Sequence, residues 1–171
     1  MDMTEVRIRP ITEADAEGFR QAVGMVGRER IYIRLTAAPS AEDALAFVRS
    51  NIENGHPQFV AEHAGDIVGW CDIVRGDYEA EKHVGSLGMG IIPAWRERGV
   101  GRRLIEATLE AADAAKFLRI ELTVNADNER AIRLYKSVGF VEEGRKRSAR
   151  LLQEQFRDVL MMGRLRLSPQ S

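Results

Sequence analysis

Residues 91–102 read IIPAWRERGVGR, which predicts the end of a strand, a glycine-containing loop and the first turn of a helix. Gly99 and Gly101 lack side chains, so the loop backbone can approach a ligand closely. Unpaired N–H groups and the positive end of a helix dipole bind phosphate. Four arginines and one glutamate lie within residues 96–103. The stretch therefore predicts an anion site, and the alternative is a solvated helix start.

Two common nucleotide motifs do not fit this loop. A dinucleotide-binding fingerprint needs a third glycine at position 104, which is Leu104. A P-loop ends in Gly-Lys-Ser or Gly-Lys-Thr, and neither tripeptide occurs here. A different phosphate-bearing ligand is therefore expected.

Alternating and helical apolar patterns surround the loop and indicate about seven strands and four helices. The order strand–helix–strand at the centre predicts a mixed α/β sheet. We expect helices after Thr12, after Ser40, from about 100 to 116, and after Asn128. The expected strands are residues 6–10, 59–62, 67–74, 84–92, 120–124, 140–152 and 156–167.

The expected strand 84–92 is unusual because it contains Gly85, Gly88 and Gly90. Glycine weakens a strand and often marks a bulge or the close approach of a ligand. An irregular edge strand is the alternative.

Overall composition limits the possible partners. The 171 residues are expected to form a single domain, 1–171, and the net charge of −1 argues against nucleic acid or an anionic membrane as partner. No apolar run reaches the ~18 residues of a membrane span. The lone Cys71 excludes an internal disulfide, and Cys and His are too few for a zinc site. We expect a cytoplasmic protein without metal.

Two segments, RERGVG at 96–101 and NERAIRLYKSVGF at 128–140, resemble signatures of the GNAT superfamily of acyl-CoA-dependent N-acetyltransferases. The resemblance implies about seven mostly antiparallel strands, with a central parallel pair that splays around the pantetheine arm of acetyl-CoA. It also implies a cofactor site built from residues Gly90, Ile91, Ile92, Arg96, Glu97, Arg98, Gly99, Val100, Gly101, Arg102, Asn128, Ala131 and Tyr135.

Acetyl transfer needs a neutral amine, donors for the oxyanion and an acid for the leaving thiolate. Tyr135 falls at the family's tyrosine position and is protonated at neutral pH, so we expect it to be the acid. Core packing alone is the alternative role. The backbone N–H of Ile91 or Ile92 is the expected oxyanion donor.

The general base is harder to assign from the sequence. Many members of the family carry a carboxylate on a central strand, where this chain has Ser86 and Thr123. Glu121, His83 and Glu81 are candidates, and a base acting through water is the alternative.

Two basic clusters are expected on the acceptor side and favour a carboxylate-bearing acceptor, unless they are surface charge or a dimer contact. They comprise Arg28, Arg30 and Arg34, near Glu29 and Tyr32, and Arg145, Lys146, Arg147 and Arg150. Other residues expected to line that side are Trp70, Cys71, Asp72 and Trp95.

These observations predict direct acetyl transfer from acetyl-CoA to the amine of a small molecule, such as an amino acid, in a ternary complex. Cys71 is disfavoured as a nucleophile because no activating His lies near it in sequence. The alternatives are acetylation of protein N-termini or lysines, a non-catalytic acyl-CoA sensor, and a scaffold. The resemblance also implies a homodimer, with the C-terminal strands as the expected edge.

Overall fold

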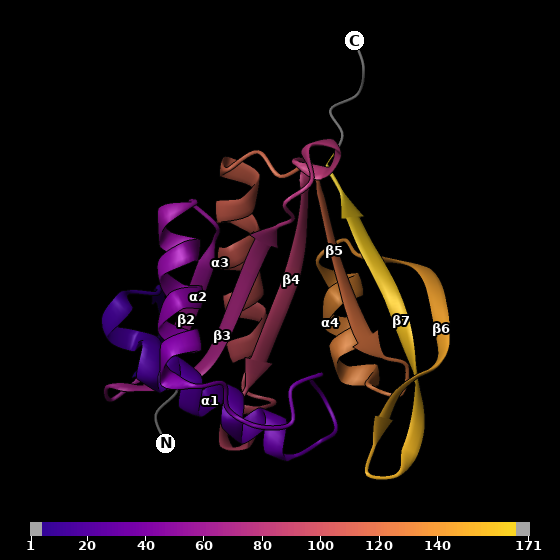
Figure 1. Ribbon diagram of the computed structural model, residues 1–171, viewed down its shortest axis with the longest axis horizontal. Helices are drawn as coiled ribbons and strands as arrows, with labels where there is room; N and C mark the ends of the chain where they lie inside the picture. Colours follow the sequence, from indigo (N-terminus) through magenta and orange to yellow (C-terminus); the bar gives the residue numbers. More distant parts are fainter. Residues whose placement is uncertain (1–4, 167–171) are drawn as a thin grey trace.

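The computed structural model describes residues 5–166, which build one seven-stranded sheet with helices on both faces (Figure 1). In space the strands follow the order β1-β2-β3-β4-β5-β7-β6. The strands are β1 (Arg7–Pro10), β2 (Gln58–His63), β3 (Asp66–Arg75), β4 (Val84–Ile91), β5 (Arg119–Asn125), β6 (Val141–Leu152) and β7 (Gln155–Leu165). The helices are α1 (Ala16–Arg28), α2 (Ala41–Glu53), α3 (Val100–Ala114) and α4 (Glu129–Ser137), with 3-10 turns η2 (Glu13–Asp15), η3 (Glu79–Glu81) and η4 (Pro93–Trp95).

The predicted mixed sheet is confirmed. β4 and β5 are parallel, and every other neighbouring pair in the described sheet is antiparallel. β6 lies at one edge, as expected for a C-terminal strand. The expected end of the last strand at Leu167 lies outside the described residues.

Local capping explains where the helices begin. The Ser40 hydroxyl accepts a hydrogen bond from the Asp43 backbone N–H at 3.0 Å, which starts α2 as predicted. Thr12 and Asp15 form a capping box where a helix was expected, but it caps the short turn η2, and α1 begins only at Ala16.

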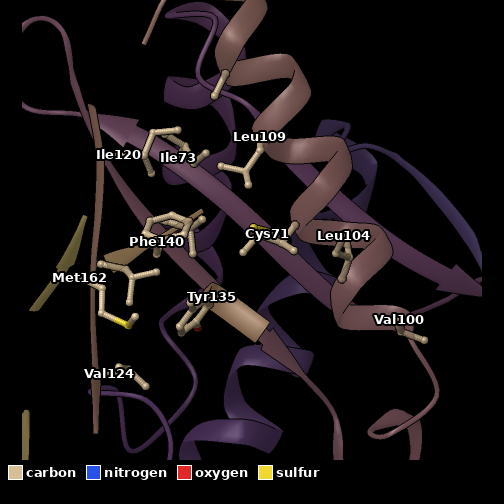
Figure 2. Packing of buried hydrophobic residues seen from close by; sticks show 14 of the residues in the cluster. Cys71, Ile73, Val100, Leu104, Leu109, Ile120, Val124, Tyr135, Phe140 and Met162 are labelled. Carbon is tan, nitrogen blue, oxygen red and sulfur yellow. The ribbon is translucent and has the colours of Figure 1, made fainter. Parts of the chain in front are cut away.

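Apolar side chains form one packed layer on each face of the sheet. α1 and α2 cover one face, where Phe19 stacks on Phe47 and meets Trp70 edge to face. α3 and α4 lie on the other face with Leu104, and Figure 2 shows Cys71 among the side chains of this layer. The sheet therefore lies between two packed layers, one under α1 and α2 and one under α3 and α4.

The glycines of β4 serve a different purpose from the one expected. The register from Gly69 opposite Ile91 to Arg75 opposite Gly85 is regular, so the predicted bulge is wrong. The edge alternative is also wrong, because β4 lies between β3 and β5. A Cβ on Gly85 would lie 2.5 Å from Ile73 Cγ2, and one on Gly90 would collide with the Trp70 ring. Both glycines make room for large core side chains.

The two central strands part soon after they pair. Val84–Ser86 pairs with Arg119–Glu121, after which β4 continues along β3 and β5 continues along β7 (Figure 1). Within residues 5–166, the backbone edge of β4 beyond Ser86 therefore has no neighbouring strand on its β5 side.

A side chain at position 90 should destabilise this centre. Gly90→Val forces the Trp70 ring to move, and we expect the free energy of unfolding to fall by about 1–3 kcal/mol or more, measured by urea denaturation. Gly76→Val is the matched control, since the nearest atom to its Cβ is 3.8 Å away in a loop, and it should change stability by less than about 0.5 kcal/mol. Equal effects at both positions would contradict this account.

Candidate active site

A cavity of about 890 Å³ occupies the space where β4 and β5 part. Its walls come from both faces of the sheet: Gly101, Leu134 and Tyr135 from the α3–α4 side, and Asp72 and Arg150 from the opposite side. The cavity therefore passes through the sheet, so a ligand on one face can reach a ligand on the other.

The predicted glycine loop forms one mouth of this cavity. Gly99 has φ +75°, a left-handed conformation that favours glycine, and α3 begins at the next residue. Gly99, Gly101 and Arg102 all line the cavity. A Cβ on Gly101 would meet Leu134 Cδ2 at 3.5 Å and Met89 Cε at 3.7 Å, which are ordinary contacts. The fold does not need glycine at 101, whereas a ligand filling the cavity would.

Arg96 makes contacts that the sequence did not reveal. Its guanidinium forms a two-pronged ion pair with Glu29, with Nη1 2.7 Å from Oε2, and its Nε donates to the Ile91 carbonyl at 2.9 Å. The guanidinium also lies over the Tyr32 ring, 4.6 Å from the centroid. Arg96 thus joins the loop after α1 to the end of β4, beside the cavity it lines.

The other arginines of the loop take different directions. Arg98 lies over the Trp95 ring, 5.3 Å from the centroid, and Arg102 donates to Ser137 Oγ at 2.9 Å. Arg103 donates to the Val6 carbonyl at 2.9 Å. Arg102 lines the cavity and Arg98 and Arg103 do not, so less of the positive charge faces the cavity than the sequence indicated. Of the other expected cofactor residues, Glu97 lines the cavity and Val100 is buried in the core.

Hydrogen bonding in β4 separates the two expected oxyanion donors. The Ile92 N–H donates to the Val68 carbonyl at 3.0 Å. Because antiparallel neighbours exchange hydrogen bonds at alternate residues, Gly90 also points its backbone groups toward β3. The N–H groups of Ile91 and Met89 therefore face the gap. The Ile91 N–H therefore stays a candidate oxyanion donor, whereas the Ile92 N–H is already used in a hydrogen bond to β3. Met89 is a cavity residue that the sequence did not predict.

α4 places three predicted residues along the cavity. The Asn128 side chain accepts from the Ala131 N–H at 3.3 Å and so caps the helix expected after it, while both residues line the cavity. Tyr135 is buried beside Phe140, with ring centroids 6.0 Å apart, yet also borders the cavity (Figure 2). Burial raises the pKa of the Tyr135 hydroxyl, so it holds its proton at neutral pH.

Only part of each expected basic cluster reaches the cavity. Arg34 from the loop after α1, and Lys146 and Arg150 from β6, line it, whereas Arg145 pairs with Asp158 at 2.7 Å. Arg28, Arg30 and Arg147 lie outside the cavity lining.

Arg150 is held firmly in place. Its Nη1 donates to Asn125 Oδ1 at 2.7 Å and its Nη2 to Thr123 Oγ1 at 3.1 Å. The buried Asn125 also donates to the Ile31 carbonyl, which anchors the loop that carries Arg34. Burial and the nearby positive charge of Arg34 lower the pKa of Arg150. The two cations thus lie close enough to repel, which favours binding of an anion between them.

Of the other residues expected on the acceptor side, some line the cavity and others are buried in the core. Tyr32, Asp72 and Trp95 line the cavity. Trp70 and Cys71 are core residues, and burial raises the pKa of the Cys71 thiol, which disfavours a thiolate.

The expected bases differ in their surroundings. Glu121 borders the cavity but is exposed and pairs with Arg119 at 3.1 Å. His83 and Glu81 are exposed and lie outside the cavity lining. Ser86 and Thr123 do line it.

The family is shown by sequence comparison. The model of the Acetyltransferase (GNAT) family matches residues 28–140. The chain belongs to the GNAT acetyltransferase family. This GNAT enzyme is 31% identical, over 96% of its length and 100% of the relative's, to L-amino acid N-acetyltransferase AaaT of Escherichia coli (strain K12). It is 32% identical to N-alpha-acetyltransferase RimI of Mycobacterium tuberculosis (strain ATCC 25618 / H37Rv), over 85% of each chain.

A solved structure supports the same fold. YncA of Salmonella typhimurium, determined with its cofactor acetyl-CoA, superposes on this GNAT chain with a TM-score of 0.88 and 18% identity, covering 94% of each chain. At this identity the likeness concerns the fold. Across residues 5–166 no helix combines the length and the apolar character that crossing a membrane requires.

Proposed function

We propose that this enzyme transfers an acetyl group from acetyl-CoA directly to the amine of a small carboxylate-bearing molecule, an amino acid or a related compound. The cavity that passes through the sheet carries this proposal. Because its lining comes from both faces of the sheet, the cofactor and the acceptor could lie on opposite faces and meet between β4 and β5, as a ternary complex requires.

The α3 side of the cavity suits coenzyme A. The N–H groups at the start of α3, together with Arg102, would hold the diphosphate. The unpaired edge of β4 at Met89 offers backbone groups to the pantetheine amides. The acetyl-CoA present in the structure of YncA supports the same choice of donor.

The oxyanion and the leaving thiolate each have a candidate partner in the cavity. The neutral acceptor amine attacks the thioester carbonyl carbon, and the Ile91 N–H, which faces the gap, would stabilise the oxyanion. The tetrahedral intermediate then expels the thiolate, which the protonated Tyr135 hydroxyl can neutralise.

A panel of acceptors tests this function. Isothermal calorimetry should detect acetyl-CoA binding, and thiol release should follow addition of free amino acids. Selective acetylation of N-terminal peptides or lysine-containing proteins would instead favour protein acetylation, the activity that the name of N-alpha-acetyltransferase RimI states. Acetyl-CoA binding without thiol release for any amine would leave an acyl-CoA sensor, and absence of binding would refute the proposal.

The acceptor carboxylate provides a sharper test through Arg150. We expect Arg150→Gln to raise KM for carboxylate-bearing acceptors about tenfold or more, equivalent to ~1.4 kcal/mol, because a fixed charged donor is lost. The corresponding amino acid amides should show little change, and steady-state kinetics on each acid–amide pair measure the difference.

Arg145→Gln is the matched control for Arg150→Gln. Arg145 lies on the same strand but pairs with Asp158 outside the cavity, so its replacement should leave both KM values within about twofold. Equal KM changes for acids and amides in the Arg150 variant would show that Arg150 does not bind the acceptor carboxylate.

A further inference from the structure

Asp72 is a buried acid in a strand that is otherwise almost wholly apolar. It is 7% exposed and borders the cavity. Among residues 5–166, no side chain or backbone group donates a hydrogen bond to its carboxylate and no cation pairs with it. A buried carboxylate without a partner is costly, so packing gives no reason for an acid here.

The carboxylate lies on the acceptor face of the sheet. Successive strand residues point to opposite faces, so Asp72 shares the face of Trp70, which packs under α1, while Cys71 faces α3. The cavity wall on this face also contains Arg34 and Arg150.

Gly88 keeps the carboxylate open to the gap. It is the partner of Asp72 on β4, and a Cβ there would lie 3.4 Å from Oδ1 and 3.6 Å from Oδ2. A larger side chain at this position would cover both oxygens. The missing side chain therefore leaves a passage from Asp72 to the place where β4 and β5 part.

We propose that Asp72 is the general base that removes the proton from the acceptor nitrogen during acetyl transfer. This assignment rests on the proposed function. As the amine lone pair forms the N–C bond, the carbonyl π bond opens and the nitrogen gives its proton to a carboxylate oxygen of Asp72. Collapse of the tetrahedral intermediate re-forms the carbonyl and breaks the C–S bond, and Tyr135 protonates the leaving thiolate. Return of the proton from Asp72 to Tyr135 through water restores both groups.

The titration of Asp72 suits this role. Burial raises its pKa to about 7, so a large fraction is ionised at neutral pH and can accept a proton. Across the sheet its neighbours are the uncharged Gln58 on β2 and Gly88 on β4, and Cys71 adjoins it. The charged and titratable groups that share the cavity come from the loops, α3, β5, α4 and β6, and are Tyr32, Arg34, Arg96, Glu97, Arg102, Arg119, Glu121, Arg130, Tyr135, Glu143, Lys146 and Arg150.

The test compares Asp72→Asn with the wild type in thiol-release kinetics across pH. Wild-type kcat/KM should rise as pH increases through about 7, because the ionised carboxylate is the active form. Asp72→Asn should lower kcat roughly 10²–10⁴-fold and abolish this rise, with the acetyl-CoA Kd unchanged. Asp66→Asn is the control, because Asp66 lies on the same strand but is exposed and outside the cavity lining; it should keep kcat within about threefold and retain the pH profile.

A stability titration checks the folded state of the variant independently of activity. Asp72 has a higher pKa folded than the ~3.9 of an unfolded Asp, so the folded wild type binds the extra proton. Wild-type stability should therefore decline, relative to Asp72→Asn, as pH rises from about 4 to about 7. A cooperative unfolding transition in the variant shows that its low kcat does not reflect misfolding.

The possible outcomes separate the two proposals. If the wild type acetylates amines and the Asp72→Asn variant is equally active, the base assignment is overturned and the proposed function stands. A weakened variant that keeps the pH rise near 7 would also overturn it, since another group would then titrate. A wild type that binds acetyl-CoA but acetylates no amine would overturn both.

Discussion

Replacing Tyr135 by Phe should lower kcat roughly 10²–10⁴-fold while leaving the acetyl-CoA Kd nearly unchanged. The substitution removes one hydroxyl from a ring packed against Phe140, so the core stays filled. Without that proton donor, the intermediate must expel a thiolate into a site where burial disfavours charge. Stopped-flow measurement of thiol release, with calorimetry for Kd, gives both quantities.

The control for this variant is Tyr32→Phe. Tyr32 also lines the cavity, but its ring lies under the Arg96 guanidinium, an interaction that Phe retains. Its kcat should stay within about threefold. If Tyr135→Phe kept full kcat, Tyr135 would be a core residue alone, which is the other role its apolar helix face allows.

The sequence predicted the frame of this site well, because the frame depends on local signals. Asn128 caps α4, Ser40 caps α2, and the glycines at 99 and 101 begin α3, each as its neighbours in sequence required. The parallel contact of β4 with β5 was implied by the family resemblance, and the pairing confirms it.

What the sequence did not predict depends on residues far apart in the chain. Arg96 looked like part of an anion site, but Glu29, 67 residues away, takes up its guanidinium. Gly90 looked like a bulge, whereas the Trp70 ring opposite it requires the glycine. The role of Asp72 was missed for the same reason. An acid inside an apolar strand was the available signal, but only the pairing with Gly88 shows that it opens on the gap.

Substitution at Gly101 should separate ligand binding from fold stability more clearly than any other change in the loop. We expect Gly101→Leu to weaken acetyl-CoA binding at least a hundredfold, about 2.7 kcal/mol, because the side chain would fill the cavity beside Leu134. Leucine favours a helix over glycine by up to about 1 kcal/mol, so the midpoint of thermal unfolding should be unchanged or higher. Calorimetry and thermal unfolding of the free protein measure the two effects.

Gly101→Ala provides the intermediate step in this series. Its Cβ would make only ordinary contacts, the nearest at 3.5 Å, so the folded state accommodates it and any loss of affinity reflects the ligand. Acetyl-CoA affinity should therefore fall in the order Gly, Ala, Leu while stability does not. Unchanged affinity in the Leu variant would place the diphosphate away from the start of α3. If affinity and stability fell together, glycine at 101 would be needed for folding. Gly99 already has such a structural role, because its φ of +75° favours glycine.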